Sequence, residues 1–440
     1  MSVISNPSPR PRVAVVGAGI SGLSAAWLLS KSADVTVYEA EDRLGGHSHT
    51  VDAGETPVDT GFIVYNEVNY PNLTALFDHL EVETQPTKMS FSVSLDDGRL
   101  EYCSTGLGGL FAQKRNIVSP RFWGMLADMR RFHRTAGARL PALEAAQTPL
   151  GAYLEAEGYG RAFCEEHLLP QASAIWSSRL EDMGQYPAAA LIQFYANHDL
   201  LGLVSKIDWR TVKGGSRRYV EKLAASLGTV RRGVAARTVH REASDVQIRD
   251  SHGQVERFDE VVLAVHADQA LAILEAPSAE ETRLLSPFRY SSNLAVLHRD
   301  ERLMPRRRRA WAAWNHLAQG GRSSVSYWMN RLQSLPGEDI FVTLNPLEEP
   351  RNGTVVRADL YEHPLFDAHT ARAQRELWSL QGVQRTWFCG AWFGHGFHED
   401  GLQSGLAVAE QLGGERRPWT VPNESGRIHV TPPAGIRRAA

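Results

Sequence analysis

Cysteine and lysine are the scarce residues of this 440-residue sequence. Its three cysteines, Cys103, Cys164 and Cys389, are far apart, and no two have the C-x-x-C spacing. This pattern predicts neither a disulfide framework nor a cysteine-based metal cluster, and it fits a reducing compartment. Six of the 47 basic residues are lysines, and none follows Lys222.

Long apolar runs and a strong net charge are also missing. No stretch reaches the roughly eighteen apolar residues that a membrane span needs, so we expect any membrane contact to be peripheral. The first eleven residues lack the apolar core of a signal peptide, so we expect a cytoplasmic protein, with membrane association left open. The formal charge of −3 gives no reason to expect a nucleic-acid partner.

What the sequence does have is a strand, turn, helix and strand between Arg12 and Tyr38. The turn reads G-x-G-x-x-G, with Gly17 allowing the tight turn, Gly19 admitting a pyrophosphate and Gly22 letting the helix pack on the strand. Unpaired N–H groups at the start of the helix attract phosphates. Glu39 ends the second strand, where a carboxylate accepts hydrogen bonds from ribose hydroxyls and disfavours a 2′-phosphate. The unit predicts a dinucleotide site.

The residues after Glu39 point to FAD. The segment from Glu39 to Gly46 resembles the E-x-x-x-R-x-G-G extension of the flavin-containing amine oxidase family, in which the arginine and glycines lie beside the FAD diphosphate. Arg43 can neutralise a pyrophosphate, and Gly45 and Gly46 leave its path free of side chains. The segment that follows, through His47 and Gly61, resembles the passage from the diphosphate to the flavin ring.

A second glycine-rich turn, Gly390 to Gly405, precedes an apolar helix near the C-terminus. It resembles the closing motif of the same family, in which a helix N-terminus faces the flavin. The resemblance implies an α/β fold: a discontinuous Rossmann-like FAD-binding domain with an inserted α+β substrate domain. We assign residues 12–84, 205–270 and 383–412 to the first and 85–204 and 271–382 to the second, with irregular tails at 1–11 and 413–440.

The absence of a second G-x-G-x-x-G argues against reduction of the flavin by NAD(P)H, so electrons should come from the substrate as hydride. Many amine oxidases keep a lysine, linked through water to flavin N5, on a strand of the substrate domain. Here Asn293 or His298 occupies the comparable strand, and Gly390 is followed by Ala391 where amine oxidases usually have an acidic residue. Oxidation of amines is therefore not the favoured reaction.

Two sets of site residues follow. The candidate catalytic groups are His398, Glu399 and Tyr65, since His398 can move a proton near neutral pH. A helix-capping or packing role is the alternative for each. No metal site is expected. The candidate FAD-binding residues are Gly17, Gly19, Gly22, Glu39, Arg43, Gly45, Gly46, His47, Gly61, Val234, Gly390, Asp400, Gly401 and Leu402.

The chain is also similar to a bacterial subgroup of amine-oxidase-like flavoproteins that are associated with cyclopropane-fatty-acid-synthase-like methyltransferases. The residues that carry this likeness lie at 61–66, 326–333 and 396–401. It implies an FAD oxidoreductase that desaturates an unsaturated or methyl-branched fatty acyl chain of a phospholipid, with a methyltransferase as a pathway partner. A redox-neutral acyl double-bond isomerase, an amine oxidase and a non-catalytic FAD-binding module remain as alternatives.

Two segments that mix arginine with aromatic residues bear on the lipid partner. Residues 120–134 and 306–314 place Arg beside Trp or Phe, a combination that suits anionic headgroups and the acyl boundary. A solvated basic face over a core stripe explains either segment equally well. Peripheral membrane contact through these segments is thus a second expectation.

Overall fold

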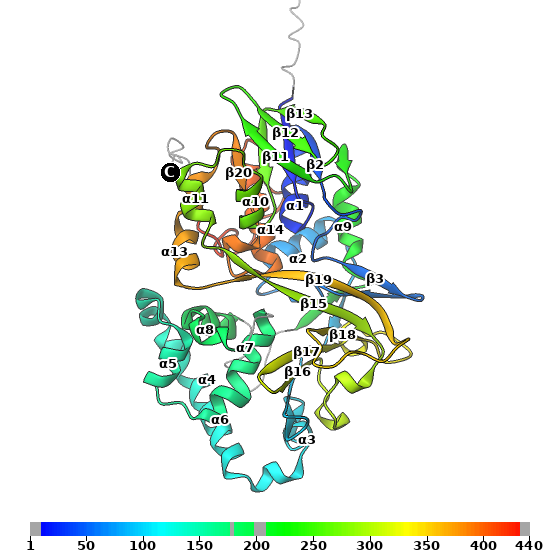
Figure 1. Cartoon of the computed structure of the whole chain (residues 1–440), viewed down its shortest axis with the longest axis vertical. Coiled ribbons are helices and arrows are strands. Elements are labelled where there is room, and N and C mark those ends of the chain that lie inside the picture. The colour runs from blue at the N-terminus through cyan, green and yellow to red at the C-terminus, as the bar shows by residue number, and fades with distance from the viewer. Residues whose placement is uncertain (1–9, 177–179, 198–207, 432–440) are drawn as a thin grey trace, which may run out of the picture.

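The computed structural model describes residues 10–176, 180–197 and 208–431. They form two lobes, with the long strands β15 and β19 running between them (Figure 1). The mixture of helices and sheets agrees with the predicted α/β class. No helix of the described part is long and apolar enough to cross a membrane.

The upper lobe is built on a parallel five-stranded sheet whose strands come from all three predicted FAD-binding segments. Nearly every residue of its central strand is buried, as in parallel sheets covered on both faces. Its order is β10 (Thr229–Arg231), β2 (Asp34–Tyr38), β1 (Arg12–Val16), β14 (Glu260–Leu263) and β20 (Thr386–Phe388). The antiparallel strands β11 (Ala236–Arg241), β12 (Val246–Asp250) and β13 (Val255–Phe258) form a small sheet beside it.

Two helices meet in the core of this lobe. Every residue of α1 (Ile20–Leu29) is buried, and it packs along α14 (His398–Gln411). Glycine permits the contact, because a Cβ at Gly405 would lie 2.2 Å from the carbonyl oxygen of Ser21. A Cβ at Gly22 would lie 1.9 Å from the carbonyl oxygen of Gly17, which confirms its predicted role in packing.

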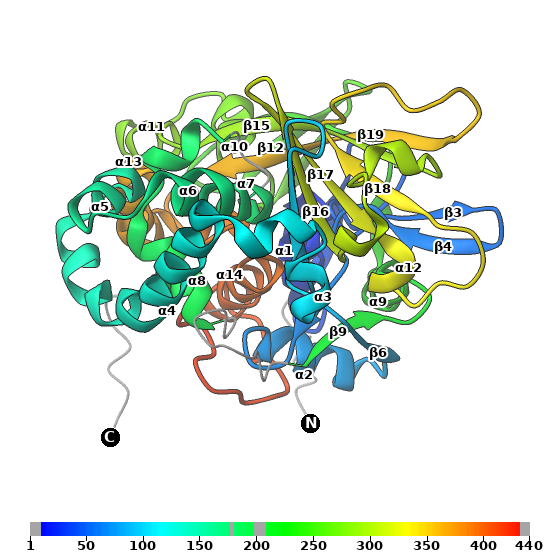
Figure 2. The ribbon, with the colours of Figure 1, turned by 90° about the horizontal axis from the view of Figure 1, so that it is seen from below.

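The lower lobe holds a mixed seven-stranded sheet and a helical layer (Figure 2). The sheet order is β19 (Val355–Leu365), β15 (Arg289–His298), β18 (Phe341–Leu344), β17 (Arg322–Trp328), β16 (Trp314–Gln319), β7 (Phe91–Leu95) and β8 (Leu100–Cys103). β7 and β8 form an antiparallel hairpin around residues 96–98. The helical layer comprises α4 (Pro120–Ala146), α5 (Leu150–Ala156), α6 (Arg161–Phe163), α7 (Leu169–Trp176) and α8 (Ala188–Asn197).

The remaining helices and strands of the described part lie within or between the two lobes. They are β3 (Thr50–Ala53), β4 (Thr56–Asp59), β5 (Tyr65–Asn66), β6 (Thr84–Thr87), β9 (Trp209–Val212), α2 (Pro71–His79), α3 (Gly106–Leu110), α9 (Arg217–Ala224), α10 (Ala267–Ile273), α11 (Ala279–Leu285), α12 (Met329–Leu332) and α13 (Ala368–Glu376). Buried Asp59, the last residue of β4, bonds the start of α9 and the end of α12. It accepts from Ser216 N at 2.9 Å and from Gln333 Nε2 at 2.9 Å.

Two details are not evident from the sequence. Pro141 lies inside α4, which continues through it to Ala146. The residues after Gly413 have no helix or strand up to residue 431, yet they pack on the core. Arg417 is buried and binds Glu410 and Asn72, and Trp419 stacks on Trp27. This described part of the tail is therefore irregular but docked.

Candidate functional site

A cavity of about 1490 Å³ is lined by residues of both lobes. It exceeds the 300–1,000 Å³ of a typical small-molecule pocket, so it has room for a dinucleotide and a second molecule. At one end are the turns after β1, β2 and β14, and at the other are residues of β16, β17 and β18. Glycine turns far apart in the sequence, at Gly17 to Gly19 and at Gly390, meet on its wall.

The first end fits a diphosphate. Gly19 lines the cavity, and a Cβ built on it has no atom within 4 Å, so only the ligand space would receive a side chain there. Gly19 is also the N-cap of α1, which has neither a side-chain cap nor an acidic residue in its first turn. The free N–H groups and the helix dipole therefore favour an anion at this position.

The neighbouring residues complete this end as predicted. Glu39 lines the cavity and is held by the backbone N–H groups of Ala18 at 2.8 Å and Glu41 at 2.9 Å. Arg43 also lines it and donates to the carbonyl oxygen of Gly46 at 2.6 Å. The residues of the predicted FAD-binding set that lie on the cavity wall are Gly17, Gly19, Glu39, Arg43, Gly45, Gly46, His47, Gly61 and Gly390. The site fits the cofactor that the sequence implies.

Three histidines line the middle of the cavity. Burial lowers the pKa of His398 to about 3 and that of His363 to about 4, and it holds the pKa of His47 well below its usual range. The His47 ring lies 5.4 Å from that of His363, centroid to centroid. At neutral pH all three rings are therefore uncharged, and they can make hydrogen bonds without adding positive charge.

His363, on β19, is a site residue that the sequence reasoning missed. Its Nδ1 accepts a hydrogen bond from Asn293 Nδ2 at 2.9 Å, and Asn293 Oδ1 accepts from Asn345 Nδ2 at 2.7 Å. Asn293 Nδ2 also donates to the carbonyl oxygen of Ser291, a pure acceptor, which fixes the orientation of the amide. With Nδ1 accepting, the proton of the neutral ring is on Nε2.

This network shows that Asn293, and not His298, is the β15 residue linked to the cavity. Asn293 reaches it through His363, whereas His298 is fully buried at the other end of the strand and bonds Thr343 at 2.7 Å. The only sequence signal for His363 was indirect. Asn293 was one of two candidates on this strand, and its hydrogen-bond partner comes from another strand.

His398 lines the cavity as predicted, but its surroundings make it a weak base. Its Nε2 lies 2.6 Å from the hydroxyl oxygen of Tyr219, which also bonds Ser48. Phe62 stacks on the imidazole with 4.0 Å between ring centroids. A nitrogen with a pKa of about 3 and a bound hydroxyl accepts protons poorly at neutral pH.

The structure corrects the two other catalytic candidates. Tyr65 is buried against Phe77, with 5.3 Å between ring centroids, and is not on the cavity wall. Glu399 is fully buried and accepts from the backbone N–H groups of Asn72 and Leu73, each at 3.0 Å. Both side chains point into the protein core because α2 packs against α14 and β5 at these positions, so both serve structure.

Five residues of the predicted FAD-binding set are not on the cavity wall: Gly22, which packs against the turn at Gly17, and the four that follow. Val234 is not on the cavity wall, and its N–H donates to Glu39 at 2.9 Å. Asp400 instead accepts from the N–H groups of His395 and Phe397, at 3.0 and 2.8 Å, and pairs with Arg427. A Cβ at Gly401 would meet Ser21 of α1 at 2.8 Å, and Leu402 is fully buried. Asp400, Gly401 and Leu402 thus position the closing turn and α14 behind the cavity wall.

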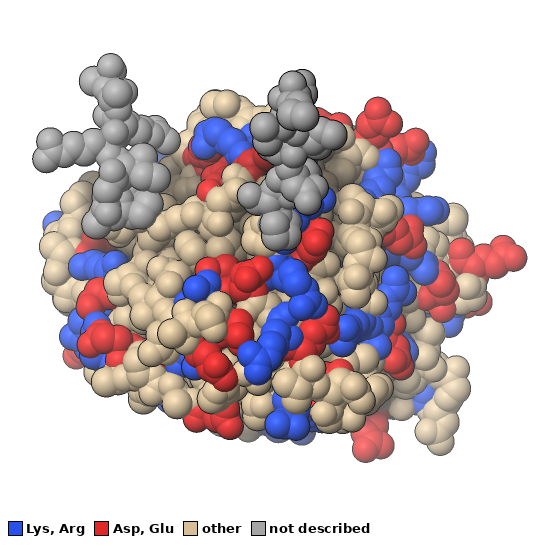
Figure 3. All heavy atoms as spheres, turned by 90° about the horizontal axis from the view of Figure 1, so that it is seen from above, with Lys and Arg blue, Asp and Glu red and all other residues tan. Residues whose placement is uncertain are grey.

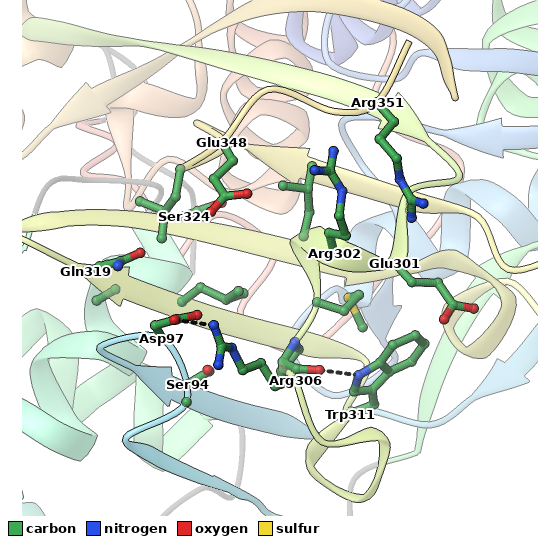
Figure 4. Close-up of a pocket in the computed structure, with 17 residues that line it drawn as sticks. Ser94, Asp97, Glu301, Arg302, Arg306, Trp311, Gln319, Ser324, Glu348 and Arg351 are labelled. Atoms are coloured by element: carbon green, nitrogen blue, oxygen red, sulfur yellow. Dashed lines mark hydrogen bonds and ion pairs between the residues drawn. The ribbon is translucent and has the colours of Figure 1, made fainter. Parts of the chain in front are cut away.

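A second cavity, of about 510 Å³, lies in the lower lobe (Figure 4). It contains part of the arginine- and tryptophan-rich segment 306–314. Arg306 pairs with Asp97, Arg307 with Glu101 and Arg308 with Asp339, and Trp311 is buried with its indole N–H on the carbonyl oxygen of Pro305 at 2.6 Å. Three of the four arginines of this segment are therefore paired with carboxylates, while Arg309 is exposed without such a partner among the described residues, and membrane contact by this segment stays a prediction.

Other chemistry has little support in the described residues. They contain no group of three or more His, Cys, Asp or Glu side chains arranged to hold a metal ion. Cys389 is buried on the strand side of the closing turn, and burial raises the pKa of its thiol. On the face seen in Figure 3, acidic and basic side chains are interspersed.

Comparison with known proteins gives consistent results. The model of the flavin containing amine oxidoreductase family matches residues 20–413. A protein named as a flavin-containing monoamine oxidase, AofH, of Mycobacterium tuberculosis is 26% identical over 310 residues, which are 64% of this chain and 63% of that protein. The chain thus aligns with somewhat less than two thirds of the length of this relative.

Solved structures share the fold at low sequence identity. The CLA-producing fatty acid isomerase from P. acnes superposes with a TM-score of 0.68 and 17% identity, covering 91% of this chain and 98% of the isomerase. Putrescine oxidase bound to putrescine gives a TM-score of 0.66 and 16% identity, covering 91% and 98%. The same architecture therefore occurs in proteins named for lipid and for amine substrates.

Proposed function

The chain belongs to the flavin-containing amine oxidoreductase family, whose cofactor is FAD, and we propose that it takes hydride from an allylic C–H bond of an unsaturated or methyl-branched fatty acyl chain. In this proposal the first end of the cavity holds the FAD diphosphate and ribose, and the second end holds the acyl chain. When bound, FAD supplies a two-electron acceptor for the hydride.

The observation that carries the proposal is the apolar second end of the cavity. An acyl chain gains free energy from such a wall, at about 25 cal/mol for each Å² buried. An ammonium group would find no carboxylate among these residues, only the faces of aromatic rings. The described residues at this end are Ile63, Val64, Ile175, Phe194, Trp209, Trp314, Tyr327, Leu344, Pro364 and Phe366.

The carboxylates of the cavity wall differ in their partners. Among the described lining residues, Asp359 pairs with Arg357 at 2.7 Å, and Glu39, Glu41 and Asp42 lie at the nucleotide end. Glu362 lies 3.3 Å from His266, whose pKa is lowered by burial, so this carboxylate has no charged partner there. Glu362 is the group that an amine substrate would meet, and the case for a neutral substrate therefore rests on the apolar wall.

His363 is the residue to which we assign the role of hydrogen-bond donor in the middle of the cavity. Its Nε2 carries the proton, and within the described residues that nitrogen has no hydrogen-bond partner. Asn293, on the strand where amine oxidases keep a lysine, acts through His363 as a positioning residue. A fixed neutral donor holds a polar group or a water molecule in place without attracting an anion.

The final step distinguishes two reactions. Desaturation removes a hydride and then a proton from the adjacent carbon, and the electron pair passes on to oxygen or a quinone. The neutral imidazole of His398 is a weak base, but a carbon next to an allylic cation is acidic enough to lose its proton to it. A methyl-branched substrate would come from a cyclopropane-fatty-acid-synthase-like methyltransferase, the pathway partner implied by the sequence resemblance.

Double-bond isomerisation is the second candidate. It returns the hydride to another carbon of the same chain, so no proton acceptor and no external oxidant are needed. The described wall holds neutral histidines beside His398, which favours this reaction over one that depends on a strong base. The fatty acid isomerase from P. acnes has the same fold.

An anaerobic mixing experiment tests the proposal. The flavin-loaded protein is mixed separately with unsaturated phospholipids, free unsaturated fatty acids, putrescine and an aromatic amine. Bleaching of the flavin band, or an altered double bond in the recovered lipid, is expected with a lipid and with no amine. A product lighter by two hydrogens identifies desaturation, and an unchanged mass identifies isomerisation. Reaction with an amine alone contradicts the proposal, and FAD binding without any turnover indicates a binding module.

A further inference from the structure

α3, the start of α4 and the segment that links them lie at the lower end of the molecule (Figure 1). They carry four exposed apolar side chains. The exposed fractions are 74% for Leu107, 50% for Ile117, 80% for Val118 and 49% for Trp123. We call these four residues, with Lys114 and Arg115, the tip patch. Monomeric proteins seldom leave large apolar side chains grouped in this way without a partner.

Hydrogen bonds and ring contacts within the tip patch fix its conformation. The Trp123 indole N–H donates to the carbonyl oxygen of Ile117 at 2.8 Å, and the Trp123 ring lies 5.8 Å from that of Phe111, centroid to centroid. Ser119 caps α4 by accepting from the N–H of Phe122. These contacts hold the apolar side chains outward in one arrangement, so they can be presented to a partner without ordering a loop first.

The stretch of sequence that carries the tip patch has basic residues and no acidic ones. The sequence has no Asp or Glu between Glu101 and Asp128, whereas Lys114, Arg115 and Arg121 all lie in that interval. Arg121 pairs with buried Glu166, but Lys114 and Arg115 are exposed and have no acidic partner among the described residues. This differs from Arg306 to Arg308, whose charges are neutralised by neighbouring carboxylates.

We propose that the tip patch docks the protein on an anionic lipid surface. Trp123 and the aliphatic side chains would enter the headgroup and upper acyl region, and Lys114 and Arg115 would lie among the anionic headgroups. Apolar burial combined with basic attraction is the chemistry of peripheral membrane binding. The inference stands apart from the chemistry of the cavity, because it rests on a different surface.

Co-sedimentation with vesicles tests this. The flavin-loaded protein should bind vesicles of phosphatidylglycerol and phosphatidylcholine, bind phosphatidylcholine alone weakly, and be released by salt, since screening weakens the basic contribution. The double variant K114E/R115E and the double variant V118S/W123S should each reduce binding about tenfold or more, in line with the contributions of basic and buried apolar groups at membranes. Unchanged thermal melting of each variant shows that the fold is intact.

Two matched controls come from the upper lobe. The exposed fraction of Val255 is 48%, nearly the same as that of Trp123. Arg249 is an exposed arginine on β12. V255S and R249E should bind vesicles as the unchanged protein does. Equal binding by the tip variants and the unchanged protein overturns the proposal. So does a protein that ignores vesicles but forms dimers that V118S/W123S abolishes, because a second copy would then be the partner. Lipid turnover is not measured, so this outcome and that of the proposed function are separate.

Discussion

Asn293 donates a side-chain N–H to Nδ1 of His363 over 2.9 Å, and this contact fixes on which nitrogen the cavity-facing ring carries its proton. A neutral ring with Nδ1 accepting is a donor at Nε2. Two strands, β15 and β19, thus supply this donor together. The first prediction concerns this pair.

Asn293→Asp should reverse the polarity of the contact, because a carboxylate accepts from Nδ1–H and leaves Nε2 without its proton. The new negative charge also raises the pKa of His363. We expect flavin reduction by the substrate to slow about tenfold or more, and its pH profile to gain a step in the range where a less perturbed histidine titrates. Stopped-flow reduction across a pH series measures both. His298→Gln, on the same strand but away from the cavity, is the control and should leave the profile unchanged.

Gly19→Ala should yield a folded protein that binds FAD poorly. A Cβ there meets no protein atom within 4 Å, so the substitution leaves the fold intact but fills the path of the diphosphate. We expect the dissociation constant for FAD to rise about tenfold or more, which corresponds to about 1.4 kcal/mol or more. Gly124→Ala, within α4, also has no neighbour within 4 Å and should bind FAD normally. Equal flavin content in the two variants contradicts the assigned diphosphate position.

Glu399→Ala should lower stability without a direct effect on the chemistry. The substitution leaves the buried N–H groups of Asn72 and Leu73 without their acceptor, which costs about 2–4 kcal/mol in total. Urea unfolding measures the loss, and the rate of flavin reduction per folded molecule should not change. Glu415→Ala, an exposed residue of the C-terminal segment, is the control. A selective loss of rate with normal stability restores Glu399 as a catalytic residue.

The protein should lose stability as the pH falls from about 6.5 towards 4. Burial lowers the pKa of His316 to about 4, so the unfolded chain takes up protons that the folded one does not. The pKa values of His49, His298, His363 and His398 are lowered in the same direction. The stabilisation is complete above the unfolded pKa and is lost as the pH falls, by up to about 1.4 kcal/mol per pH unit for each group. Thermal melts between pH 8 and 5 measure it.

His316→Leu isolates one of these groups. His316 is fully buried on β16, and neither ring nitrogen has a hydrogen-bond partner in the described structure. Its replacement should therefore cost little at pH 8 and should flatten the pH dependence by one group. A melting temperature that falls with pH as steeply as in the unchanged protein would show that His316 is not charged on unfolding.

The nucleotide end of the site could be predicted from the sequence because its geometry is local. Gly17, Gly19 and Glu39 lie within one strand, turn, helix and strand, so their spacing determines where they meet. The closing turn at Gly390 was recognisable for the same reason. Both turns reach the wall of one cavity, as expected.

The middle of the site could not be predicted in the same way. His363 meets Asn293 through the pairing of β19 with β15. The two residues are 70 positions apart in the sequence, and nothing in the intervening residues signals that register. Tyr65, Glu399 and Asp400 were assigned to the cavity because they are polar and close to the motifs. Which side of a turn or helix faces the ligand depends on packing, and α1, α2 and α14 turn these residues inward.

The most direct test of the central claim is anaerobic flavin reduction by an unsaturated acyl chain that carries deuterium at its allylic carbons. If hydride leaves from that position, the flavin band bleaches with the lipid and bleaches more slowly with the deuterated form. If the band stays unchanged with every unsaturated lipid, and neither desaturated nor isomerised lipid is recovered, the apolar end of the cavity does not hold an acyl substrate.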